Sequence, residues 1–144
     1  MKLYLDNCCF NRPFDDQSQL RIRLESEAKL KIQEEIRAGS FQLAWPYILD
    51  YENSKNPFQE RKIRISGWRK YACQHIEESA ELIEIAASLN QMGLQKLDSL
   101  HVACAIQSKC DYYLTTDDKV LKRSDQISDI HVTDPIAFIK EVLS

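Results

Sequence analysis

The sequence predicts an α/β fold in which a central, mostly parallel sheet of four to five strands is flanked by helices. Short apolar runs, which are typical of buried strands, alternate along the chain with longer segments in which apolar residues recur at steps of three and four. Two of the apolar runs end directly in a carboxylate, at Asp6 and at Asp117. The length of 144 residues suits one domain with a sizeable core, so we expect residues 1–144 to form a single domain.

The first part of the chain predicts two strands, each followed by a helix. Residues 2–5 form an apolar run and are expected to be a buried strand. Apolar residues recur among charges over residues 15–38, which predicts a long amphipathic helix that stops at Gly39. Residues 41–45 are the second strand candidate, and Pro46 suits the first turn of a helix that continues to about residue 54.

The rest of the chain continues this alternation. The basic segment 58–73 predicts one or two helices, and apolar steps of three and four predict another over residues 76–90. A helix over residues 96–109 is largely uncharged, so we expect it to be buried on more than one side. Residues 111–116 then form a strand. After it we expect a helical turn at residues 120–123, a strand at 130–132 and a closing helix at 135–143.

The charge balance limits how the protein could bind nucleic acid. The 19 lysines and arginines face 22 acidic residues, which gives a formal net charge of −3. Such a chain cannot hold a polyanion by bulk positive charge, so binding would need local basic patches or bound cations.

Several other classes are excluded by what the sequence lacks. The five cysteines include no CxxC pair, which disfavours a disulfide framework or a four-cysteine zinc site. The three glycines lie too far apart for a P-loop or a dinucleotide fingerprint. No apolar stretch is long enough for a membrane span, and the N-terminus resembles no signal peptide, so we expect a cytoplasmic protein without a membrane partner.

Four acidic residues lie at or next to apolar elements, namely Asp6, Glu52, Asp98 and Asp117. Taken singly, each could cap a helix or a loop, or face solvent. Four carboxylates that converge would repel one another, so a cluster of this kind favours a hard divalent metal, Mg²⁺ or Mn²⁺. Such a metal would bind a phosphodiester and lower the pKa of a bound water, which indicates hydrolysis of a nucleic-acid backbone.

The order of these residues resembles that of PIN-domain proteins. The resemblance is carried by L-Y-L-D-N at residues 3–7, the helical Glu52, L-D-S-L-H-V-A at 97–103 and D-Y-Y-L-T-T-D at 111–117. It covers essentially the whole chain and implies a PIN-like fold. Many PIN proteins are metal-dependent ribonucleases whose products carry a 3′-hydroxyl and a 5′-phosphate, and many small bacterial ones are toxins of toxin–antitoxin pairs.

The resemblance also implies roles for the four acids. Asp6, Asp98 and Asp117 match the metal-binding carboxylates of the family, and Glu52 matches its helical acid, so the four together would be catalytic.

Two further residues match supporting positions of the family. Thr115 corresponds to a hydroxyl that helps to order the site, and Asn7 to a polar neighbour of the first Asp. Asp50 and Asp118 lie close enough in sequence to two of the site acids to take their places, and this alternative stays open.

A basic segment is the candidate RNA-contacting face. Trp68 and Tyr71 are interleaved with its cations and could stack on bases, while Lys62 and Arg69, with Arg12 near the first loop, could contact phosphates. The alternative is a solvated helix face whose aromatic residues belong to the core. The cations of this segment are Lys55, Arg61, Lys62, Arg64, Arg69 and Lys70.

One pair of residues suggests a different metal. His101 and Cys104 lie three residues apart on one predicted helix, a spacing compatible with zinc. The apolar surroundings favour a packed histidine instead.

These observations together predict an endoribonuclease that uses Mg²⁺ or Mn²⁺. Its expected partners are an RNA substrate, an antitoxin protein and a second copy of the chain. The alternative from another class is a catalytically silent PIN-like module that binds protein or RNA. A phosphatase with Asp6 as nucleophile would need a second Asp two residues on, where Cys8 stands.

Overall fold

The computed structural model describes residues 1–143, and its centre is a parallel sheet. The strands are β1 (Lys2–Leu5), β2 (Gln42–Pro46), β3 (Gln74–Ile76), β4 (Tyr112–Leu114) and β5 (His131–Thr133). They lie in the order β3-β2-β1-β4-β5, and every pairing is parallel. The sheet confirms the predicted α/β class with a parallel sheet flanked by helices.

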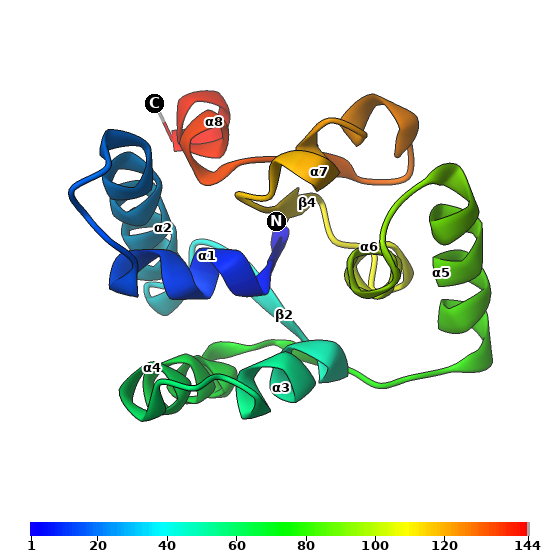
Figure 1. Cartoon of the computed structure of the whole chain (residues 1–144), viewed down its shortest axis with the longest axis horizontal. Helices are drawn as coiled ribbons and strands as arrows, with labels where there is room; N and C mark the ends of the chain where they lie inside the picture. Colours follow the sequence, from blue (N-terminus) through cyan, green and yellow to red (C-terminus); the bar gives the residue numbers. More distant parts are fainter. Residues whose placement is uncertain (144) are drawn as a thin grey trace.

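Helices cover both faces of the sheet (Figure 1). The α-helices are α1 (Asn7–Asn11), α2 (Leu20–Arg37), α3 (Tyr47–Ser54), α4 (Gln59–Ser66), α5 (Ala80–Met92), α6 (Lys96–Gln107), α7 (Asp118–Leu121) and α8 (Pro135–Phe138). Three short 3₁₀ helices, η1 (Arg12–Phe14), η2 (Gly67–Tyr71) and η3 (Ser124–Gln126), and the π-helical turn η4 (Ile139–Leu143) complete the described chain. No helix within residues 1–143 is long and apolar enough to cross a membrane.

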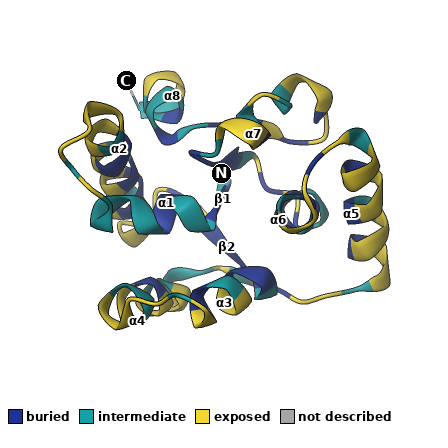
Figure 2. Cartoon of the chain, viewed as in Figure 1, coloured by how far each residue is buried: buried dark blue, intermediate teal, exposed yellow. Residues whose placement is uncertain are grey.

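The alternation of side chains along β1 divides the core into two clusters. Leu3 and Leu5 pack with Ile32 of α2 on one face of the sheet. Tyr4 packs with Val102 of α6 on the other face. Figure 2 shows the buried residues of the flanking helices on the sides that face the sheet. Because successive side chains of a strand point to opposite faces, a central parallel strand is apolar on both faces, as residues 3–5 of β1 are.

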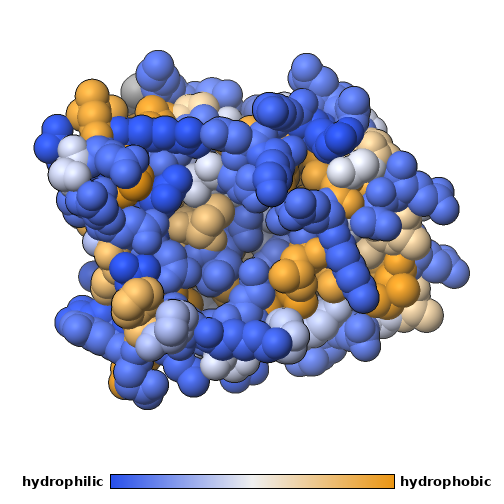
Figure 3. Space-filling view, in the orientation of Figure 1, coloured by the Kyte–Doolittle hydropathy of each residue, from blue (hydrophilic) through white to orange (hydrophobic). Residues whose placement is uncertain are grey.

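The carboxyl ends of β1, β2 and β4 each lead into a short helix. These helices, α1, α3 and α7, surround the centre of the view in Figure 1, where α6 is seen end-on. Figure 3 shows this face of the molecule as largely hydrophilic, with a hydrophobic patch over α5 and α6. The predicted site acids follow the same strand ends or lie on these helices, so the topology brings them to one edge of the sheet.

The start of α2 differs from the prediction. The helix begins at Leu20 rather than at residue 15, because the preceding chain is held in a different conformation. Residues 12–14 form the 3₁₀ helix η1 with Pro13 in its first turn, and Asp15 ends it with an extended backbone. Proline and the polar residues after it favour such turns over an early helix start.

Two further boundaries also differ. Pro46 closes β2 and precedes α3 instead of forming the first turn of the helix. Residue 76, the predicted start of a helix, belongs to β3, and α5 begins at Ala80. The hydroxyl of Ser79 accepts the N–H of Leu82 at 3.2 Å, which fixes the start of α5 at that point.

Candidate metal centre at the sheet edge

Asp6 lies at the carboxyl end of β1 and is buried, with 6% of its surface exposed. Its Oδ1 accepts the N–H of Asn7 at 2.7 Å and so caps α1. Its Oδ2 accepts the hydroxyl of Thr115, at the end of β4, at 2.9 Å. One carboxylate oxygen is therefore held by the first residue of α1 and the other by the residue that follows β4.

Thr115 also connects Asp6 to Asp117. The fully buried hydroxyl of Thr115 accepts the backbone N–H of Asp117 at 3.1 Å. Asp117 in turn caps α7, since its Oδ1 accepts the N–H of Lys119 at 2.9 Å. One hydroxyl thus fixes the relative positions of an acid from β1 and an acid from the β4–α7 junction.

Glu52 on α3 is hydrogen-bonded to His101 on α6 through the imidazole Nε2. The other ring nitrogen, Nδ1, is paired with the hydroxyl of Tyr4 at 2.6 Å, and the histidine is almost completely buried. The Nε2 also lies 3.8 Å from Oδ1 of Asp6. One ligand-type atom each from Asp6, Glu52 and His101 lies within 4.8 Å of the others.

The charges around His101 decide its protonation. Burial by itself would lower the pKa of the imidazole, but the hydrogen bond to Glu52 and the charges of Asp6, Glu52 and Asp98 raise it above its ordinary value. The nearby carboxylates thus outweigh the effect of burial on the pKa of His101.

Asp98 lies in the first turn of α6, one turn before His101. Burial, followed by the negative charges of Asp6, Asp117 and Glu52, raises the pKa of Asp98 to about 6 against the opposing effect of His101. A carboxyl that is this strongly affected by three other acids shares their electrostatic environment. The structure therefore brings all four sequence-predicted acids to the same edge of the sheet.

This donor set fits a hard divalent cation. Carboxylates from β1, α3, α6 and the β4–α7 junction lie at this edge, close enough for three of them to raise the pKa of the fourth, Asp98. Oxygen ligands are those that Mg²⁺ and Mn²⁺ prefer, and a bound cation would remove the repulsion that raises the pKa of Asp98.

The two neighbouring acids that could replace site residues are engaged elsewhere. Asp50 accepts the indole N–H of Trp45 at 2.8 Å and lies 3.8 Å from Arg69. Asp118 pairs with Arg21 at 2.8 Å and is largely exposed. The group formed with His101 contains Asp6 and Glu52 and none of Asp50, Asp118, Asp98 and Asp117.

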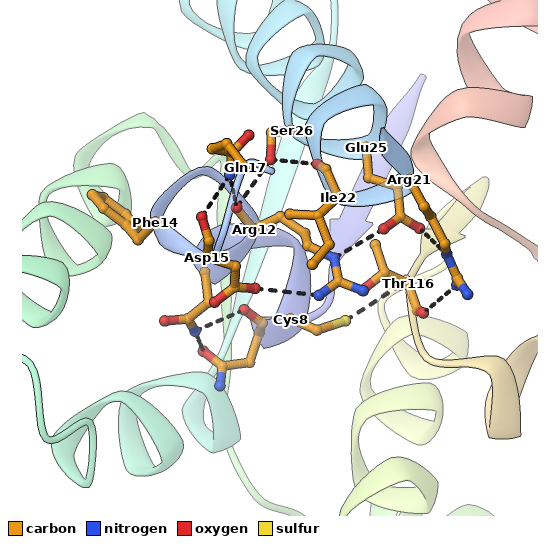
Figure 4. Close-up of polar contacts among 12 residues, drawn as sticks. Cys8, Arg12, Phe14, Asp15, Gln17, Arg21, Ile22, Glu25, Ser26 and Thr116 are labelled. Carbon is orange, nitrogen blue, oxygen red and sulfur yellow. Dashed lines mark hydrogen bonds and ion pairs between the residues drawn. The ribbon is translucent and has the colours of Figure 1, made fainter. Parts of the chain in front are cut away.

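Arg12 is tied into an ion-pair network instead of facing the carboxylates (Figure 4). Its Nε donates to Glu25 of α2 at 2.9 Å, and its Nη1 donates to Asp15 at 3.2 Å. Glu25 is buried and also accepts a hydrogen bond from Arg21. The guanidinium thus compensates a buried carboxylate, which gives it a structural task.

The predicted RNA-contacting face on α4 and η2 is partly neutralised. Arg69 lies near Asp50, and the aromatic pair Trp68 and Tyr71, with ring centroids 5.0 Å apart, packs against the core. Arg37 of α2 covers both rings, at 5.1 and 5.8 Å from their centroids. The aromatic residues therefore follow the alternative in which they belong to the core. The backbone carbonyl of Lys62 accepts a hydrogen bond from Asn53.

Two residues near Asp6, Asn7 and Cys8, make contacts that the sequence pattern did not specify. The amide of Asn7 contacts Asn11, and its backbone N–H, not its side chain, supports Asp6. The thiol of Cys8 lies 3.4 Å from Oγ1 of Thr115 and 3.6 Å from Oδ2 of Asp6. Cys8 is therefore next to the carboxylates, and no spacing rule would have found it. All five cysteines are free.

The contact of His101 with Glu52 was also missed by sequence reasoning. The sequence predicted that His101 is packed in the interior, and this burial is confirmed, because the residue is 1% exposed. The available signal was its position one helical turn after Asp98, which places both side chains on the same face of α6.

Comparison with known proteins places the fold. No protein-family model matches the sequence, and no curated protein matches it. Among solved structures, VapBC2 from Rickettsia felis bound to a DNA fragment from its promoter is similar, with a TM-score of 0.59 and 16% identity over 93% of this chain and 98% of the other.

Two other solved structures are similar to the same degree. FitAcB from Neisseria gonorrhoeae has a TM-score of 0.60 at 13% identity and covers 92% of this chain and 97% of its own. VapBC-1 from nontypeable Haemophilus influenzae has a TM-score of 0.58 at 15% identity, and the match covers 94% of this chain and 98% of the other. The likeness extends over nearly the full length of each chain and confirms the PIN-like fold expected from the sequence.

Proposed function

We propose that this protein is an endoribonuclease that hydrolyses RNA phosphodiester bonds with Mg²⁺ or Mn²⁺ held by its carboxylates. The observation that carries the proposal is the convergence of Asp6, Glu52, Asp98 and Asp117 at one sheet edge, with the pKa of Asp98 raised to about 6. A protein maintains such repulsion where a cation is to be bound.

Each residue of the site has a proposed role in binding the cation or in hydrolysis. Asp6, Asp98 and Asp117 would hold the cation, which when bound supplies a water of lowered pKa and stabilises developing charge. Glu52 would hold the cation or orient the attacking water, and His101 fixes the Glu52 carboxylate. The Thr115 hydroxyl fixes Oδ2 of Asp6. In the hydrolysis, the water oxygen bonds to phosphorus, the bond to O3′ breaks, and O3′ receives a proton.

Cleavage of a labelled single-stranded RNA tests the proposal. We expect cleavage with Mn²⁺, none with EDTA, and loss of cleavage in Asp98→Asn. Asp129→Asn, which changes an exposed acid in the same way, is the matched control and should cleave normally. Activity that EDTA leaves unchanged would refute the metal mechanism. Absence of Mn²⁺ binding in titration calorimetry would favour the catalytically silent module.

The proposal includes an antitoxin partner. The similar structures are toxin–antitoxin complexes, and their toxin-type fold is the one this chain adopts. Expression of the wild-type chain in a bacterial host should arrest growth, and co-expression of a small protein encoded beside it should restore growth and co-purify with it. Growth arrest that persists in Asp98→Asn would separate toxicity from nuclease activity.

A further inference from the structure

A cationic pocket adjoins the carboxylate cluster on its α7 side. The pocket has a volume of about 330 Å³ and lies between α6, α7 and η3. Asp98 lines it, and so do three cations, Lys119, Lys122 and Arg123. Asp98 thus belongs both to the carboxylate cluster and to the wall of this pocket.

Arg123 is held in place at the pocket wall. Its Nη1 donates to the carbonyl of Met92 at 3.0 Å and lies 3.3 Å from Oε1 of Gln126. Gly93, with a φ of +122°, leaves room for the guanidinium, because a Cβ at this position would lie 2.6 Å from the Cζ of Arg123. Within residues 1–143, Nε and Nη2 of Arg123 make no hydrogen bond. The fixed guanidinium therefore keeps two donor groups for a ligand.

The two lysines are also unpaired. Lys119 and Lys122 are exposed on and just after α7, and neither ammonium group forms an ion pair or hydrogen bond with the described residues. The arginines of the α4 and η2 segment differ, since Arg61 pairs with Asp15, Arg64 with Glu60 and Arg69 with Asp50. Three cations that form no ion pair with the described residues thus line one pocket together with Asp98.

We infer that this pocket binds a phosphate of the RNA backbone next to the phosphate that occupies the carboxylate site. The inference rests on the proposed function and assigns a substrate-binding role to Lys119, Lys122 and Arg123. Phosphate is the group that lysine and a fixed guanidinium recognise, and the acids of the cluster would otherwise repel the chain on either side of the scissile bond. The α4 and η2 face is then not the main path of the RNA.

Equilibrium binding of a fluorescently labelled single-stranded RNA tests the inference without relying on cleavage. Binding is measured at several salt concentrations, in EDTA and again in Ca²⁺, for the wild type, Lys119→Gln/Lys122→Gln and Arg123→Gln. The double variant Lys62→Gln/Arg69→Gln removes the same number of charges from the other face and is the matched control.

We expect the α7 double variant to bind about 10- to 30-fold more weakly at 0.1 M salt. Its slope of log affinity against log salt should fall by about 0.7, since one lost phosphate contact on a single strand contributes about 0.7 and both lysines face the same phosphate. Arg123→Gln should lower the slope by about 0.7, and the control should change it little.

The outcomes separate this inference from the nuclease proposal. If the wild type cleaves RNA but the control variant loses binding while the α7 variant does not, the pocket assignment is wrong and the nuclease proposal stands. If the α7 variant loses binding but no metal-dependent cleavage is found, the pocket stands and the nuclease proposal fails. A wild type that binds RNA in neither condition overturns the pocket assignment.

Discussion

The imidazole of His101 is hydrogen-bonded to the carboxylate of Glu52, a residue 49 positions earlier in the chain and on a different helix. The tyrosine hydroxyl that pairs with the other ring nitrogen, that of Tyr4, comes from β1. The orientation of Glu52 at the sheet edge thus depends on a side chain that is itself fixed by the central strand. A buried partner of this kind typically contributes 10- to 100-fold to metal affinity or activity.

Replacing His101 tests that dependence. We expect His101→Gln to lower metal-dependent RNA cleavage and Mn²⁺ affinity by about 10- to 100-fold, because Glu52 loses the group that orients it. Calorimetric titration with Mn²⁺ and a cleavage assay measure the two effects. His75→Gln, the same change at an exposed position on β3, should leave both unchanged. Equal losses in the two variants would show that the effect is general instability.

Asp98→Asn should stabilise the metal-free protein. The pKa of Asp98 lies at about 6 in the folded state, above its ordinary value of 3.8, so the folded state binds more protons than the unfolded state between these pH values. The stability of the wild type in EDTA should therefore fall as the pH rises from about 4 to 6 and remain reduced at neutral pH.

The neutral amide of Asp98→Asn removes the free-energy cost of an ionised carboxylate at this position. In EDTA at pH 7.5, thermal unfolding of Asp98→Asn should show a gain of about 1–2 kcal/mol, or a Tm higher by a few degrees. With Mn²⁺ the order should reverse, because only the wild type gains stability from the bound ion. A lower Tm of the variant in EDTA would contradict the repulsion described for the cluster.

Lys29 of α2 is a buried cation whose pKa is lowered by burial to about 7. Its Nζ lies 5.3 Å from the ring centroid of Phe10. Because the unfolded state stays protonated up to about pH 10.5, stability should rise as the pH increases from about 7 towards 10.

Methionine at this position should remove that pH dependence. At pH 6 we expect the free energy of unfolding of Lys29→Met to exceed that of the wild type by about 1–3 kcal/mol, measured by urea unfolding. The difference should shrink as the pH rises above 7. Lys31→Met changes an exposed lysine of the same helix and should stay within about 0.5 kcal/mol of the wild type. A destabilised Lys29→Met would show that the ammonium group has a favourable partner.

Arg12→Gln distinguishes a structural arginine from an RNA contact. Removal of the guanidinium leaves the buried carboxylate of Glu25 with Arg21 as its remaining partner, so we expect a loss of about 2–3 kcal/mol in the free energy of unfolding. RNA affinity of the folded variant should be unchanged. A loss of affinity without a loss of stability would return Arg12 to the RNA-binding surface.

The sequence was informative where one local pattern determines the structure. The apolar run of β1 followed by Asp6, and that of β4 followed by Asp117, predict strands that end in acids, because a central parallel strand is buried on both faces. The topology then brings both acids to one edge without further information. The presence of the long helices α5 and α6 followed from their apolar periodicity, although α5 begins at Ala80 and not at residue 76.

Elements fixed by partners distant in the sequence could not be predicted in this way. β3 has three residues, and its pairing with β2 determines its conformation against a helical pattern. Arg12 carries the charge of an RNA contact, but Glu25, which engages it, comes from α2. His101 resembled a core residue because its neighbours on α6 are apolar. Its hydrogen-bond partner, Glu52, comes from α3, so the α6 sequence alone does not reveal the contact. In each case the structure or role of the residue depends on a contact with another helix or strand.

The hydrogen bond from Thr115 to Asp6 joins residues 109 positions apart, near opposite ends of the chain. During synthesis, Asp6 emerges early, but its partner strand and the acid at position 117 follow only after most of the protein has been made. Contacts of such long sequence separation form late, since the intervening chain must first be ordered. An incomplete nascent chain therefore lacks the assembled carboxylate cluster, and any activity of that cluster begins only when folding of the sheet is nearly complete.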